Sequence, residues 1–152
     1  MIRSTGHCGQ QIYRVPHSDD RGIGVFARLA GAPADRNLID LYGDAGIEFI
    51  GLRDDRQDDK FGIAVGYAHV SKRAQALDAD YRLMTDPNWP VRSFERLITA
   101  VYQYQIKDGW TVQPNIQYII HPGGGATLPT SPFPGKPLSN ATVFGLRTTL
   151  KF

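Results

Sequence analysis

Apolar and polar side chains alternate with a period of two along much of this chain. Near the C-terminus, the even-numbered positions from Thr142 to Phe152 are apolar or threonine, whereas the odd-numbered positions include Arg147 and Lys151. Because successive side chains of a strand point to opposite sides, the pattern predicts a strand with two differently solvated faces. The apolar face suits lipid and the polar face suits a water-filled interior. On this segment alone, an edge strand of a soluble sandwich is the better interpretation.

The same alternation recurs upstream and predicts an all-β chain, a meander of about seven antiparallel strands. Residues 1–8 match no pattern and form an unassigned N-terminal stub, which leaves 9–152 as the strand-bearing part. The expected strands are Gly9–Val15, Gly22–Ala30, Asp44–Leu52, Phe61–Lys72, Ser93–Ile106, Trp110–His121 and Asn140–Phe152.

The connectors between these strands alternate strictly between short and long. The short ones are polar, and the long ones are rich in Pro, Gly or Asp. A soluble meander has no reason for this rhythm, whereas an outer-membrane barrel has tight periplasmic turns and longer outer loops. The short connectors are Pro16–Arg21, Arg53–Lys60 and Lys107–Gly109, and the long ones are Gly31–Gly43, Arg73–Arg92 and Pro122–Ser139.

The polar faces of the expected strands carry charged and amide side chains that would share one interior. Arginine and amide groups pair well with the vicinal hydroxyls of sugars, and Phe26 offers a face for stacking on a sugar ring. For any single residue, a generic solvated porin wall is the simpler explanation. The expected pore-lining residues are Arg28, Glu48, Glu95, Gln103, Gln113, Asn115, Gln117 and Arg147.

The apolar faces fit contact with lipid. The expected strand 110–121 has Trp110 near one end and Tyr118 near the other, as two interfacial aromatic girdles require. Phe152 would join the periplasmic girdle. Arg96 interrupts the apolar face of 93–106. At mid-bilayer an arginine costs roughly 2–4 kcal/mol, but near the outer end of a strand it reaches the head groups at about 0–1 kcal/mol.

Composition narrows the function classes. The 152 residues suffice for one domain, and 17 basic against 15 acidic residues give a net charge of +2, without the basic footprint of a nucleic-acid binder. One cysteine, Cys8, excludes an internal disulfide. No apolar run is long enough for a membrane-spanning helix, and the N-terminus lacks the apolar core of a secretory signal.

No catalytic, cofactor-binding or metal-ligating constellation is visible, so the chain is not expected to be an enzyme. The paired aspartates Asp19-Asp20, Asp54-Asp55 and Asp58-Asp59 all fall in expected turns, where acidic residues are usually solvated. The four histidines are scattered without metal-ligand spacing. The triple glycine at 123–125 lacks the lysine and the helix pattern of a phosphate-binding loop.

Four blocks of sequence resemble the carbohydrate-selective porin (OprB) family. They are G-V-F-A-R-L-A-G-A-P-A-D-R-N-L-I-D at 24–40, G-L-R-D-D-R-Q-D-D-K-F-G-I-A-V-G-Y-A at 51–68, Q-P-N-I-Q-Y-I-I-H-P-G-G at 113–124 and A-T-V-F-G-L-R-T-T-L-K-F at 141–152. The resemblance implies a transmembrane β-barrel of about sixteen strands in the outer membrane of a Gram-negative bacterium, through which sugars such as glucose diffuse to the periplasm.

The same resemblance implies small sugars, outer-membrane lipid and lipopolysaccharide as partners, no nucleic acid and no cofactor, and leaves homo-oligomerisation open. Seven strands would leave two unpaired edges in hydrocarbon, so the sequence is expected to be the C-terminal portion of a longer barrel. Two alternatives remain from the residues alone. One is a soluble β-barrel or sandwich that binds a small ligand, and the other is an outer-membrane structural protein without transport.

Overall fold

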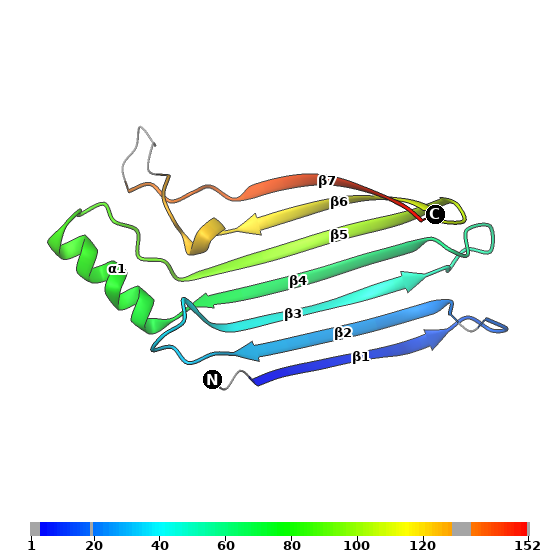
Figure 1. Cartoon of the computed structure of the whole chain (residues 1–152), viewed down its shortest axis with the longest axis horizontal. Coiled ribbons are helices and arrows are strands. Elements are labelled where there is room, and N and C mark those ends of the chain that lie inside the picture. The colour runs from blue at the N-terminus through cyan, green and yellow to red at the C-terminus, as the bar shows by residue number, and fades with distance from the viewer. Residues whose placement is uncertain (1–3, 19, 129–134, 152) are drawn as a thin grey trace.

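The computed structural model describes residues 4–18, 20–128 and 135–151, and these form one antiparallel sheet of seven strands in the order β1-β2-β3-β4-β5-β6-β7. Each strand pairs with its neighbour in sequence, so the sheet is a simple meander (Figure 1). The predicted all-β fold is confirmed. The strands are β1 (Ser4–Arg14), β2 (Gly22–Gly31), β3 (Ile39–Ile50), β4 (Lys60–Val70), β5 (Phe94–Lys107), β6 (Trp110–Ile120) and β7 (Ala141–Leu150).

The register keeps the two predicted faces separate across the sheet. Directly opposed residues of antiparallel strands point to the same side. The pairs Ala45–Val65 and Val65–Ile98 therefore share one face, which is apolar. The pair Gln113–Arg147 lies on the other face, which is polar. We call these two sides the apolar face and the polar face.

The predicted strand β6 contains a proline, and the sheet accommodates it without a change of register. Pro114 is paired with Leu146 of β7. On the β5 side, the pairs Val101–Asn115 and Tyr104–Val112 flank it in the same register, and pairing lapses between them. Proline has no N–H to donate to the ladder. It therefore opens a gap in the β5–β6 ladder but produces no bulge there.

Few side chains are buried in this single-layered sheet. Among the described residues, Val70 is the only buried hydrophobic side chain, whereas Val65, Phe144 and Leu146 on the apolar face are 51%, 77% and 75% exposed. A soluble sandwich would cover the apolar face with a second layer. The sandwich alternative required the set that includes Ile63 and Val65 to pack inward, and in this chain both are exposed. That alternative is contradicted.

Two strands are longer than the sequence pattern indicated. Strand β1 starts at Ser4, inside the segment 1–8 that had no assignment, and β3 starts at Ile39 rather than Asp44. The β2–β3 connector is therefore the short segment 32–38, and the expectation of strictly alternating connector lengths is wrong there. Asp40 and Gly43 resemble turn residues, but Tyr42 and Asp44 continue the polar face, which is the signal that the strand has already begun.

The β4–β5 connector, expected as a loop, contains the helix α1 (Lys72–Met84). Ser71 caps it, because the Ser71 hydroxyl accepts a hydrogen bond from the Ala74 N–H at 3.3 Å. The helix lies at the end of the sheet that carries the two long connectors, β4–β5 and β6–β7, and the short β2–β3 connector. We call this the end of the longer connectors; it is opposite the short turns (Figure 1). No helix in the described parts of the chain is long and apolar enough to cross a membrane.

Candidate functional site

The polar face of the sheet is the candidate functional site. The strand register places all eight predicted pore-lining residues on this one face. They come from five of the seven strands: Arg28 on β2, Glu48 on β3, Glu95 and Gln103 on β5, Gln113, Asn115 and Gln117 on β6, and Arg147 on β7.

Three of the eight residues surround one hollow near the short turns. Gln103, Gln113 and Arg147 line it, together with Lys60 and Gln105, and its volume is about 1100 Å³. Lys60 was missed because it fell in the expected connector 53–60, whereas Gln105 follows the alternation of Gln103 on the same face but was not among the eight predicted residues. Amide, ammonium and guanidinium groups around one hollow offer many donors for the hydroxyl oxygens of a polar solute.

Asn115 and Gln117 form a smaller polar group in the middle of β6. The Gln117 amide donates to the Asn115 side-chain oxygen at 3.2 Å. The Asn115 amide lies across Gly145 of β7, where a Cβ would be only 2.6 Å from its nitrogen. The glycine thus lets an amide lie flat along the wall, which keeps the surface polar while occupying little of the space in front of it.

Arg28 belongs to a charged cluster nearer the longer connectors. Its guanidinium contacts the Asp44 carboxylate at 2.5 Å, and the Tyr42 hydroxyl donates to the same carboxylate at 2.7 Å. The guanidinium also lies 5.3 Å from the centre of the Tyr42 ring. Tyr42 was missed because it fell in the expected loop 31–43. The arginine is therefore held in place by a neighbour and is half-exposed toward the space before the sheet.

Glu95 and Glu48 have different surroundings. The Glu95 carboxylate accepts a hydrogen bond from the Gly123 N–H at 2.6 Å, so it ties the start of the β6–β7 connector, the 3₁₀ turn Pro122–Gly124, to the wall. Glu48 pairs with Gly24 on one side and Gly62 on the other. Because both of these residues are glycines, no side chain stands directly opposite Glu48 on either neighbouring strand.

Phe26 lies flat on the polar face because Gly46 of the adjacent strand has no side chain. A Cβ at Gly46 would lie 2.6 Å from the Phe26 ring and 2.8 Å from the Ile63 carbonyl oxygen. One side of the ring is covered by the strand, and 36% of the residue remains exposed. An aromatic face presented in this way suits stacking on the apolar side of a sugar ring.

Replacing Gly46 by valine is expected to lower the free energy of unfolding by about 1–3 kcal/mol, because the ring must leave its rotamer. The control is Gly62→Ala on the same face, where a Cβ meets only the Ile47 carbonyl oxygen at 3.7 Å. Urea unfolding of each variant refolded in phosphatidylcholine vesicles measures the difference. Equal stability of the two variants would show that Phe26 does not depend on Gly46.

Aromatic side chains gather at both ends of the apolar face. Near the short turns, the rings of Phe49 and Phe61 stack at 5.9 Å, and near the longer connectors the rings of Tyr67 and Phe94 stack at 6.0 Å. Aromatic belts of this kind occur where strands cross the two membrane interfaces. The predicted girdle position Phe152 lies outside the described residues.

The β3–β4 turn is anchored beside the girdle at the short turns. Asp59, which is 6% exposed, accepts hydrogen bonds from the Tyr102 hydroxyl at 2.6 Å and from the Gln105 N–H at 2.8 Å. The Arg56 guanidinium lies over the Tyr104 ring, 4.0 Å from its centre. These contacts fix the turn against β5 and place a cation at the edge of the apolar face.

The described residues contain no group of three His, Cys, Asp or Glu side chains that could hold a metal ion. Their organised feature is a two-faced sheet with polar groups on one side and apolar groups bounded by aromatic belts on the other. This combination defines a segment of a transmembrane β-barrel wall.

The chain belongs to the carbohydrate-selective porin, OprB family, whose family model matches residues 7–152. The family is therefore one of channels and not of enzymes. Porin B of Pseudomonas aeruginosa is 31% identical over 117 residues, which are 71% of this chain and 26% of that protein. A high-pH structure of Pseudomonas putida OprB is similar with a TM-score of 0.75 and 29% identity, over 96% of this chain and 34% of that chain.

Both relatives are much longer than this sequence, which spans about a third or less of each. The sheet described above is thus similar to one portion of a larger porin. Within the described residues, β1 and β7 are the two edges of the sheet and each has a strand on one side only.

Proposed function

We propose that this chain forms part of the wall of an outer-membrane porin through which small sugars such as glucose diffuse into the periplasm of a Gram-negative bacterium. Residues 9–152 would be the C-terminal part of a barrel of about sixteen strands, a size that leaves an aqueous channel. The observation that carries the proposal is the continuous polar face across β2 to β7 in a chain of the OprB family.

In this proposal the apolar face meets lipid and the longer connectors lie outside the cell. The eight predicted pore-lining residues then face the lumen, and the hollow around Gln103 and Arg147 lies near the periplasmic mouth. Neutral sugars carry vicinal hydroxyls, which accept hydrogen bonds from amide and guanidinium groups and donate hydrogen bonds to amide oxygens. Such hydrogen bonds are individually weak and exchange readily with hydrogen bonds to water, as passive diffusion of a sugar requires.

Swelling of vesicles tests the proposal. One chain leaves two unpaired strand edges, so a pore requires several copies to pair edge to edge and close a barrel. Phosphatidylcholine vesicles that contain the refolded chain closed in this way are expected to swell faster than empty vesicles in isosmotic glucose, and to swell more slowly in a disaccharide than in glucose. If the chain is folded and inserted but swelling equals that of empty vesicles, the chain alone does not transport. The non-transporting structural alternative is then favoured for the chain as it stands.

The lumen assignment makes a separate prediction about Arg147. Replacing it by leucine removes charged donors from the hollow, each net hydrogen bond being worth about 0.5–1.5 kcal/mol. The initial swelling rate in glucose is expected to fall by about two- to tenfold. Leu146→Met on the apolar face is the matched control and should leave the rate unchanged, since the two side chains have similar volumes. A loss of rate in the control alone would reverse the assignment of the faces.

A further inference from the structure

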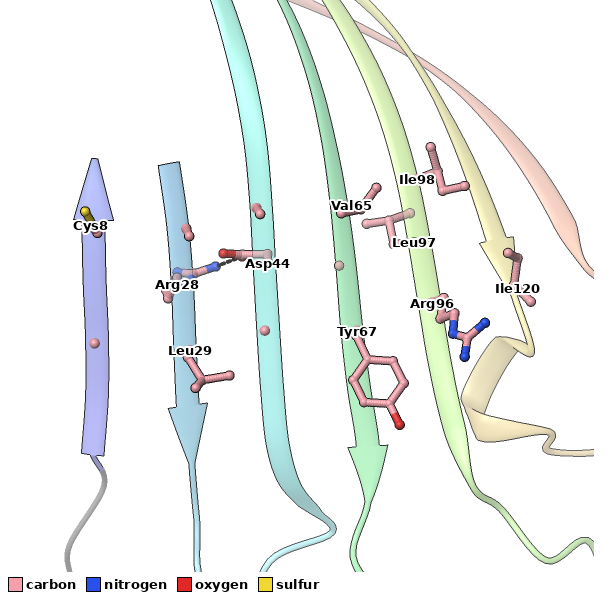
Figure 2. A pocket seen from close by; sticks show the side chains of 15 residues that line it. Cys8, Arg28, Leu29, Asp44, Val65, Tyr67, Arg96, Leu97, Ile98 and Ile120 are labelled. Atoms are coloured by element: carbon pink, nitrogen blue, oxygen red, sulfur yellow. Dashed lines mark hydrogen bonds and ion pairs between the residues drawn. The ribbon is translucent and has the colours of Figure 1, made fainter. Parts of the chain in front are cut away.

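The apolar face is not uniformly flat. A hollow of about 890 Å³ crosses it over β1 to β6 near the longer connectors. Leu29 lies on one side of it, and Val65 and Tyr67 lie on the other (Figure 2). The small residues Gly43 and Ala45 of β3, between them in the sheet, also line it. A second hollow of about 510 Å³ shares Ala45 and Val65 with the first and continues it. We call the two together the outer groove.

The outer groove extends about as deep as one lipid leaflet. Tyr67 lines its outer part and Ile63 lines its continuation, four residues further along β4. At about 3.3 Å per residue this separation is roughly 13 Å. The hydrocarbon core of a bilayer is about 30 Å thick, so one leaflet contributes about 15 Å. A single acyl chain lying along the strands would therefore fill the groove from the interface toward the midplane.

An arginine without a carboxylate partner stands at the outer end of this groove. Arg96 pairs with Tyr67 across the β4–β5 ladder, and its guanidinium lies 4.6 Å from the centre of the Phe94 ring and 5.9 Å from that of Tyr67. Among the described residues no acidic side chain forms an ion pair with it. The two rings hold the cation in place but do not neutralise its charge.

We infer that the outer groove and Arg96 form a binding site for a lipid with a phosphate-bearing headgroup. Guanidinium presents a planar fork of N–H donors that matches phosphate geometry. Phosphate groups of lipids lie at the depth that Arg96 occupies, near the outer end of β5. An acyl chain of the same molecule would cover Ala45 and Val65. The site rests on the proposed orientation of the apolar face toward lipid.

A second copy of the chain is the competing occupant, but it fits the charge less well. The apolar face brings a cation to the end of the groove, and another copy in the same orientation would bring an arginine to the same membrane depth. Like charges brought together in a medium of low dielectric constant repel. A phosphate-bearing lipid instead supplies the charge that is missing and the hydrocarbon that covers the groove.

The test measures the urea midpoint of the chain refolded in phosphatidylcholine vesicles with and without phosphatidylglycerol. The wild type is expected to be stabilised by the anionic lipid, and Arg96→Gln should lose most of that shift. Arg53→Gln is the matched control, because it removes an exposed arginine at the opposite, short-turn end. Ala45→Phe, which fills the floor of the groove while leaving Arg96 in place, should also reduce the shift.

Any of the following results would contradict the proposed lipid-binding site. An equal loss of the shift in Arg53→Gln and Arg96→Gln means general attraction to an anionic surface. A shift produced by inorganic phosphate in phosphatidylcholine vesicles means that the groove is not used. Stability that rises with the protein-to-lipid ratio but ignores phosphatidylglycerol means that a second copy occupies the groove. If the wild type does not insert into either vesicle, the orientation itself fails, which separates that failure from failure of the lipid site.

Discussion

Replacing Val65 by arginine is expected to destabilise the membrane-inserted chain by about 2–4 kcal/mol. Val65 is the middle residue of β4, it lies on the apolar face, and it is 51% exposed. At this depth the new guanidinium would reach neither interface easily, so its desolvation would be only partly relieved by snorkelling. Urea unfolding in phosphatidylcholine vesicles measures the change in the free energy of unfolding.

The neighbouring Ala64 provides the matched control. Its side chain is on the polar face, opposite Gly46 and Thr99, where a long cationic side chain can extend into water. Ala64→Arg is therefore expected to cost less than about 1 kcal/mol, the usual range for a solvated surface site. The face assignment would be refuted if Ala64→Arg cost as much as Val65→Arg, or more.

The second large effect is expected at the helix in the β4–β5 connector. Asp78 of α1, 1% exposed, receives hydrogen bonds from the Arg92 side chain at 2.8 Å to each carboxylate oxygen, and from the Arg92 backbone N–H at 3.1 Å. The Trp89 indole N–H adds a fourth at 3.3 Å. Removing one partner of a buried ion pair leaves the other charge uncompensated.

Arg92→Ala is accordingly expected to reduce the local stability of the connector by roughly 3 kcal/mol. Hydrogen exchange of the α1 amides would then speed up by about a hundredfold. The control is Arg82→Ala on the same helix, whose exposed guanidinium donates only to the Trp89 carbonyl at 2.7 Å. If exchange speeds up equally in both variants, the Asp78–Arg92 pair is not what orders the connector.

The same pair gives the connector a dependence on pH. Burial by itself raises the pKa of Asp78, but hydrogen bonds from the Arg92 side chain, the Arg92 backbone and Trp89 outweigh it, and the pKa lies below the ordinary value of 3.8. A carboxyl group whose pKa is lower in the folded state than in the unfolded state stabilises the fold. This stabilisation is complete above the pKa of the unfolded state and is lost as the pH falls through the pKa of the folded state. The protection factors of the α1 amides, which compare each exchange rate with the intrinsic rate at the same pH, should therefore fall below about pH 4. In Arg92→Ala, protonation of Asp78 relieves an unpaired charge, so acid should not lower the protection factors of the α1 amides.

Most of the sheet could be predicted from the sequence because its strands are two-faced. Alternation of period two identifies a strand and assigns its side chains to two faces. In a meander, the order of the strands along the chain then also gives each strand its neighbours. The pattern failed where turn-forming residues occur inside a strand, as at Asp40 and Gly43, and where a helix lacks an apolar stripe. The helix α1 packs through the charged Asp78 and not through a hydrophobic face, so hydrophobic periodicity did not reveal it.

The candidate site was predictable as a surface but not as a set of contacts. Period-two alternation placed Gln113 and Arg147 on one face, and the register confirms that placement. The alternation does not show which carboxylates have partners, such as Asp44 in its ion pair with Arg28 or Glu95 in its hydrogen bond to the β6–β7 connector. Those contacts depend on which side chains become neighbours across the sheet, which requires the register itself.

The lapse of pairing at Pro114 has a consequence for the shape of the wall. It divides the β5–β6 ladder into two blocks that share one register as far as Gln105, beyond which the register shifts by one residue at the turn. Between the blocks the strands can splay or tilt without any residue exchanging its partner. Curvature of the sheet can therefore change along this line while the alternation of faces is preserved. The gap in hydrogen bonding at Pro114 is therefore a line along which the sheet can bend.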